Sequence, residues 1–157
     1  YMGVDQNGVS PAPKTITYDD VAACSGAMGL ATLDQFIDFI LLGNSADAFA
    51  LFKRLMDDGV AEIALIRAFL AHGRKLQSTH LRVMDGEDLS MIMDGRDAPV
   101  FFKRKAAFTA QLRKWPMAKL STLMHDLLMA EMKMKSGLDA PATLPQMFLA
   151  LSARAGK

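Results

Sequence analysis

Apolar residues return every third or fourth position along most of the chain, which is the period of an α-helix. Thr32 and Gln35 form a capping-box pair, and the pattern that follows them stops at Gly43. That stripe consists of Leu33, Phe36, Ile37, Ile40 and Leu41. A second helix is predicted from a Ser45 cap to Gly59, with Ala48, Leu51, Phe52, Leu55 and Met56 as its stripe. The tight joint between the two predicts an antiparallel hairpin.

Residues 60–84 carry the longest helical pattern. Their first half, VAEIALIRAFLA, is apolar on nearly all sides, so it should run through the middle of a bundle with Ile66 in the core. Their second half, HGRKLQSTHLR, is polar and should emerge from the bundle. A weak helical segment around 88–93 follows.

Two prolines and one glycine, Pro99, Pro116 and Gly137, mark ends of further predicted helices. Asp97 and Pro99 are a favourable helix start, and Pro116 and Gly137 bracket a further helix. The helix after Pro99 has Phe101, Phe108 and Leu112 on one side and Lys103, Arg104 and Lys105 on the other. The helix after Pro116 has the stripe Leu120, Leu123, Met124, Leu127 and Leu128. The last helix, from Thr143, points Leu144, Met147, Phe148 and Leu151 inward.

The fold class predicted from these segments is all-α, a compact bundle of six to eight helices over about residues 30–155. Residues 1–14, rich in Gly and Pro, resemble a linker or the tail of a preceding domain, and a short helical stretch follows up to Gly26. No segment alternates with the period of a strand.

Composition and charge narrow the functional classes. The 157 residues suit one domain, 51% of them are hydrophobic, and the net charge of +1 indicates no strong attraction to nucleic acid or anionic membrane. Cys24 is the only cysteine, which excludes an intrachain disulfide and fits a cytoplasmic location. No apolar run is long enough to span a membrane. The 12 Met residues fill the core or form an adaptable binding surface.

Motifs for catalysis, cofactors and metals are not found in the sequence. There is no phosphate-binding loop, no G-x-G-x-x-G turn and no H-E-x-x-H, so neither ATP binding nor a cofactor is expected. His72 and His80 lie on one helical face without a third metal ligand, and we expect both to be solvated. We expect no enzymatic activity from this chain by itself.

The basic segment 96–114 is the one notable charge feature. Its functional interpretation is a phosphate-contacting surface built by Lys103, Arg104 and Lys105. Its simpler interpretation is a solvated helix face. The first interpretation makes the chain a helical nucleic-acid-binding module, which remains the alternative function.

Four segments in order resemble the C-terminal collar region of the bacterial DNA polymerase III delta subunit. ITYDDV at 16–21 is similar to the end of that family's middle domain, and residues 33–77 to its first collar helices. APVFFKRKAAF at 98–108 resembles a Pro-Phe-x-x-Lys-Arg helix, and MAEMKMKSG at 129–137 a motif ending in Lys-Ser-Gly. Met129 departs from that motif, because the family has an acid there.

The resemblance implies a non-catalytic subunit of a clamp loader, which places the sliding clamp on primed DNA during replication. It assigns residues 1–26 to a linker and remnant of the lid domain, and residues 27–157 to a helical collar domain. The implied partners are the delta prime and gamma/tau subunits, reached through the collar. The sliding clamp is contacted only by an N-terminal domain that these residues do not include, and DNA contact is indirect or weak.

The candidate subunit interface lies on helical residues that exceed one buried stripe. Phe102 is the leading candidate, because it falls off the side shared by Phe101 and Phe108. Arg74 on the long helix and Met147 on the last helix complete the predicted set.

Overall fold

The computed structural model describes residues 32–97, 99–137 and 144–155. Within these ranges it contains seven α-helices, one short 3-10 helix and no strand, which confirms the all-α prediction. The first helix covers residues 32–42. The others are α2 (Ser45–Asp57), α3 (Glu62–Met84), α4 (Leu89–Asp94), η1 (Phe102–Arg104), α5 (Lys105–Lys114), α6 (Met117–Lys135) and α7 (Leu144–Ala155). The predicted linker, the short helix before Gly26 and the Thr143 start lie outside the described residues.

Three predicted helix ends, at Gly43, Gly59 and Gly137, are confirmed. Gly43, Gly59 and Gly137 all have positive φ angles, of 87°, 82° and 75°. After α2 the chain turns with Gly59 N–H donating to the Met56 carbonyl and Val60 N–H donating to the Leu55 carbonyl, at 3.0 Å each. A side chain on Gly59 would strain this left-handed turn, so glycine is the residue that fits there.

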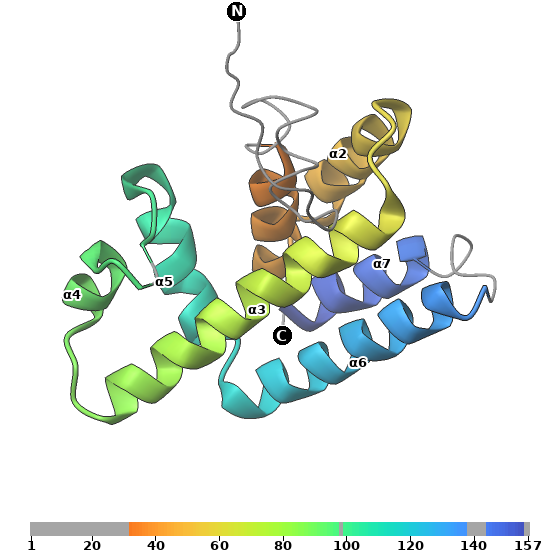
Figure 1. The fold of residues 1–157 in the computed structure, drawn as a ribbon. Helices are drawn as coiled ribbons and strands as arrows, with labels where there is room; N and C mark the ends of the chain where they lie inside the picture. The colour runs from red at the N-terminus through yellow and green to blue at the C-terminus, as the bar shows by residue number, and fades with distance from the viewer. Residues whose placement is uncertain (1–31, 98, 138–143, 156–157) are drawn as a thin grey trace, which may run out of the picture.

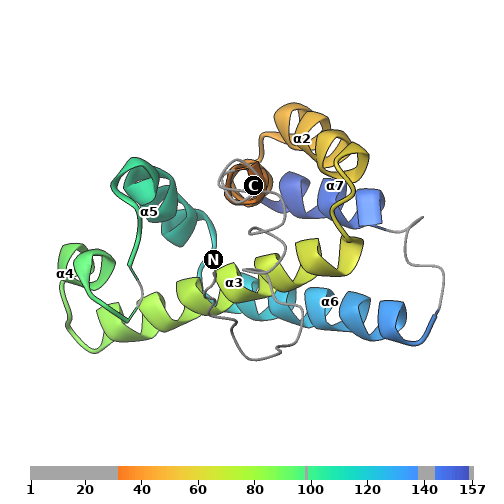
Figure 2. The same cartoon turned by 45° about the horizontal axis from the view of Figure 1, so that its top comes forward.

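Helix α3 is the axis of the molecule. Figure 1 shows it crossing the molecule, with α4 and α5 near its C-terminal half, α2 and α7 near its N-terminal half, and α6 alongside. Figure 2 gives the same arrangement after rotation. Helix α6 runs antiparallel to α3, because Arg67 bonds Glu131 while His80 bonds the Trp115 carbonyl just before α6. Between these contacts, Met124 packs against Gly73, where the missing side chain lets the two helices approach closely.

Four phenylalanine rings join the helices that cover the first half of α3. Phe36, Phe52, Phe69 and Phe148 come from the 32–42 helix, α2, α3 and α7. The Phe148 ring meets Phe36 edge-on at 5.0 Å between centroids and stacks on Phe69 at 5.8 Å. Such contacts are worth roughly 0.5–1.5 kcal/mol each beyond the area they bury. The cluster therefore holds three helices against α3 at one place.

Several local predictions were wrong. Asn44, not Ser45, is the residue before α2. Pro99 does not begin a helix, because the chain becomes helical only at Phe102. Phe101 is exposed instead of sharing a buried side with Phe108, since it precedes the helix and is not held to its period. Leu128 is exposed, because α3 covers only the side of α6 that carries the rest of the predicted stripe.

The second half of α3 emerges less than predicted. Its residues Gly73, Leu76 and Thr79 are buried together with His72. The reason is that α6 packs against Gly73 and α5 packs over His72, and the sequence pattern of α3 alone reveals neither contact.

The core assignment can be tested with Ile66→Ala and Leu127→Ala. Both side chains are completely buried, on α3 and α6. Each substitution should lower the free energy of unfolding by about 2–5 kcal/mol, because it removes buried methyl groups and leaves a cavity. Urea denaturation measures this change.

The matched control for these variants is Leu149→Ala, which truncates an exposed leucine on α7. It should cost less than about 1 kcal/mol. A loss this small at Ile66 or Leu127 would contradict the core described above.

Candidate interaction surfaces

Two of the three basic residues predicted to contact phosphate are already paired with carboxylates inside the fold. Arg104 makes a forked contact with Asp38, with Nε donating to Oδ2 at 2.9 Å and Nη2 to Oδ1 at 2.7 Å. Asp34 lies 3.3 Å from the same guanidinium. Lys105, at the start of α5, pairs with Asp94, at the end of α4. Arg104 and Lys105 therefore do not form one open cationic face with Lys103.

The third basic residue, Lys103, is exposed beside two exposed aromatic rings. Phe101 and Phe102 are 60% and 68% exposed, and their rings lie 4.8 Å apart between centroids. The Lys103 ammonium lies 5.9 Å from the centroid of the Phe102 ring. This group forms an exposed apolar and basic projection at η1, so Phe102 is accessible to a partner.

The other two predicted interface residues differ in accessibility. Arg74 is exposed on α3. Met147 is half-buried and packs against the core from α7. The structure does not bring Arg74 or Met147 together with Phe102 in any described contact, so the three do not form one continuous site.

The outer side of α6 is an exposed surface that the sequence did not predict as an interface. Residues spaced 3, 4, 3 and 4 apart are all exposed along it: Ala118, Ser121, His125, Leu128 and Met132. Met129 extends the apolar part of this row, which we call the α6 seam. None of these side chains is Asp, Glu, Lys or Arg. The signal was the excess of Leu and Met in residues 127–134, which is more than one buried stripe needs.

A buried polar network joins three helices below the basic segment. The His72 Nε2 donates to Gln111 Oε1 at 2.7 Å, because an amide oxygen can only accept. The Gln111 Nε2 donates to Asp38 Oδ1 at 2.6 Å, and Asp38 also binds Arg104. The network thus connects α3, α5 and the 32–42 helix through one unbroken chain of bonds.

The prediction that both α3 histidines are solvated was wrong. His72 is buried within this network, and His80 is half-buried with its Nε2 donating to the Trp115 carbonyl at 2.9 Å. Burial lowers the pKa of His72, and the nearby Arg104 charge lowers it further, against the raising effect of the Gln111 bond. His72 is therefore neutral at pH 7 and serves as a structural donor.

The part of the chain that the structure describes contains neither a metal-ligand cluster nor a membrane-spanning helix. No three His, Cys, Asp or Glu side chains lie together as a metal site would require. None of the described helices combines the length and apolar character that crossing a bilayer demands. Comparison with known proteins gives no significant match to a family model, a curated protein or a solved structure.

The buried His72 predicts that acid destabilises the protein. Its pKa in the folded state lies below its ordinary value of 6.5. Below pH 6.5 the unfolded chain therefore binds a proton that the folded chain does not, and stability falls as pH falls, by up to about 1.4 kcal/mol per pH unit for this one group. Urea denaturation at about pH 7.5 and about pH 5.5 measures the loss.

The comparison variant is His72→Gln, whose amide can still donate to Gln111 but does not titrate. His80 and His125 are present in both proteins, so the difference between them isolates His72. The variant should lose less stability on acidification than the wild type. Equal losses would show that His72 is not the responsible group.

Proposed function

We propose that the chain is a non-catalytic helical assembly domain whose α6 seam packs against a helix of a neighbouring subunit. The observation that carries the proposal is the exposed 3-4-3-4 row from Ala118 to Met132. That spacing is the one with which helices pack side by side at a shallow angle. An exposed row of this kind, left uncovered by the helices that the structure describes, suits a partner helix.

The residues of the seam match such a contact in chemistry as well as spacing. Leu128, Met129 and Met132 supply the apolar centre, and methionine adapts to irregular partner surfaces. Two neighbouring acidic residues are engaged within the chain, since Asp126 pairs with Arg154 at 2.9 Å and Glu131 with Arg67 at 3.1 Å, whereas Lys133 is exposed next to Met132. The two acids therefore do not compete with a partner for the apolar centre of the seam, and Lys133 lies at its edge.

The kind of assembly proposed is a collar of clamp-loader subunits, with delta prime and gamma/tau as the neighbours. This step rests on the resemblance of the ordered segments to the delta collar region. A side-by-side helix contact is what a ring of helical domains needs. Under this proposal the chain acts in DNA replication without binding the sliding clamp itself.

The alternative of a nucleic-acid-binding module has less support. Its proposed contacts include Arg104 and Lys105, whose charges are balanced by Asp38 and Asp94. A phosphate would have to displace these carboxylates before it could bind. Strongly salt-dependent binding of DNA by the chain would favour the alternative.

The seam is tested by Leu128→Arg in a binding assay with purified delta prime and gamma/tau subunits from the same organism. A buried charge at the centre of a helix contact should weaken binding at least about tenfold, since such a residue dominates the interface energy. Surface plasmon resonance measures the affinity.

Leu149→Arg is the matched control, because Leu149 is 47% exposed and Leu128 is 42% exposed, and Leu149 lies on α7 and not on α6. It should bind as the wild type does. Binding to the sliding clamp but not to the other subunits would refute the proposal. Unchanged binding by Leu128→Arg would remove the seam from the interface.

Phe102→Ala tests the aromatic projection separately. If Phe102 anchors the same assembly, its loss should weaken binding by about tenfold or more, as truncation of a buried interface aromatic does. Because the side chain is exposed, the fold should be unaffected, which circular dichroism checks. Unchanged affinity would leave the seam as the interface and exclude Phe102 from it.

A further inference from the structure

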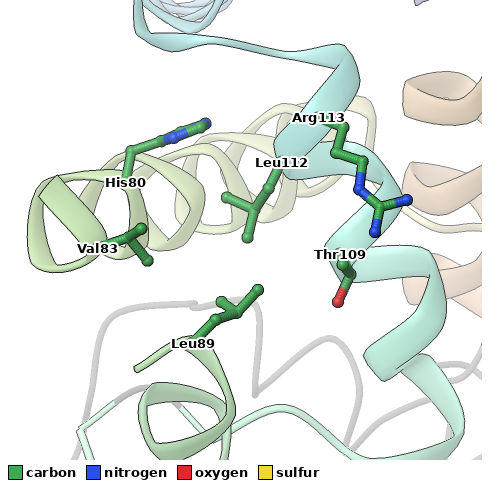
Figure 3. A pocket seen from close by; sticks show the side chains of 6 residues that line it. All are labelled: His80, Val83, Leu89, Thr109, Leu112 and Arg113. Carbon is green, nitrogen blue, oxygen red and sulfur yellow. The ribbon is translucent and has the colours of Figure 1, made fainter. Parts of the chain in front are cut away.

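A groove lies where the end of α3 meets α4 and α5. Six residues line it: His80 and Val83 from α3, Leu89 from α4, and Thr109, Leu112 and Arg113 from α5. Figure 3 shows Val83, Leu89 and Leu112 converging from the three helices onto the space between them. None of the lining residues belongs to α6, so the groove is separate from the α6 seam.

The groove has the size of a single side chain. Its volume of about 230 Å³ is below the roughly 300–1,000 Å³ that small-molecule sites occupy. Its inner surface is formed mainly by the branched apolar side chains of three helices. A pocket of this size and character takes one apolar anchor of a partner protein, which is how pockets at interfaces contribute most of their affinity.

The three polar side chains around the groove differ in whether they already have a hydrogen-bond partner. The His80 Nε2 is used by the Trp115 carbonyl, and the Thr109 hydroxyl donates to the Lys105 carbonyl at 2.8 Å. Arg113 is exposed and makes neither an ion pair nor a side-chain hydrogen bond with any residue that the structure describes. Its guanidinium, on the α5 side beside Thr109, is therefore the group left to meet a ligand (Figure 3).

The geometry points to a second docking site, one that takes a partner's peptide segment carrying an apolar side chain next to a carboxylate. The apolar side chain enters among Val83, Leu89 and Leu112, and the carboxylate pairs with Arg113 at the rim. Arginine matches a carboxylate with two parallel N–H donors, which fixes the peptide's direction as well as its charge. This site goes beyond the α6 seam and does not depend on it.

The test is selection of random displayed peptides against the full chain, followed by affinity measurement with variants. The enriched peptides should carry Leu, Ile, Met or Phe beside Asp or Glu. Arg113→Gln should weaken their binding about tenfold, the size of one charge-assisted hydrogen bond. Val83→Gln should weaken it as well, because it places an amide in the apolar lining.

Two controls make the result specific to the groove. Arg74→Gln changes another exposed arginine outside the lining and should leave peptide binding unchanged. Leu128→Arg, which disrupts the α6 seam, should also leave it unchanged, so failure of one surface is distinguishable from failure of the other. Circular dichroism confirms that each variant is folded.

Three outcomes would overturn the proposal. The first is that no peptide is enriched, or that the enriched peptides lack an acid. The second is that Arg113→Gln binds them as the wild type does. The third is a dimer in analytical ultracentrifugation that Arg113→Gln abolishes, which would assign the groove to a second copy of the chain.

Discussion

The burial of α3 is the constraint on which the rest of the structure depends. Its first half is apolar on nearly every side, with Leu65, Ile66 and Phe69 all fully buried, so no single neighbouring helix can cover it. Helix α6 covers one side and comes close because Gly73 has no side chain. The 32–42 helix, α2 and α7 cover others through the phenylalanine cluster. This arrangement leaves the far side of α6 in solvent, and the α6 seam follows from it.

Side-chain hydrogen bonds, in addition to apolar packing, hold the second half of α3 against its neighbours. Helix α5 covers the second half of α3 at His72. The contact brings together His72 of α3, Gln111 of α5 and Arg104 of η1, polar groups that are costly to bury without partners. Each has a partner, and the chain of bonds ends on Asp38 of the 32–42 helix. Loss of one partner would leave a buried polar group unsatisfied, at a cost of roughly 1–3 kcal/mol. The same network sets the position of α5, and α5 forms one wall of the groove.

The sequence predicted what is local and missed what depends on tertiary packing. Helix existence follows from the period of apolar residues, and the stops at Gly43 and Gly59 follow from backbone sterics, so both were predictable. The side on which Leu128 lies depends on how much of α6 is covered by α3, and the burial of His72 depends on α5. Neither the exposure of Leu128 nor the burial of His72 can be predicted from the sequence of the helix that carries the residue. The interface candidate Phe102 is exposed, whereas Phe101 does not share a side with Phe108, because the chain becomes helical only after Phe101.

The α6 seam also has a direction, which limits the partners that it can accept. One end carries the small residues Ala118 and Ser121, and the other carries the larger Leu128 and Met132. A partner helix can approach closely only at the first end, and it must present small residues opposite the second. Because no charged residue lies in the row, pairing must be selected by this taper in size, whereas the groove selects by the charge of Arg113. Under the two proposals the surfaces therefore recognise partners by different physical means, and a substitution at one should not change selection at the other.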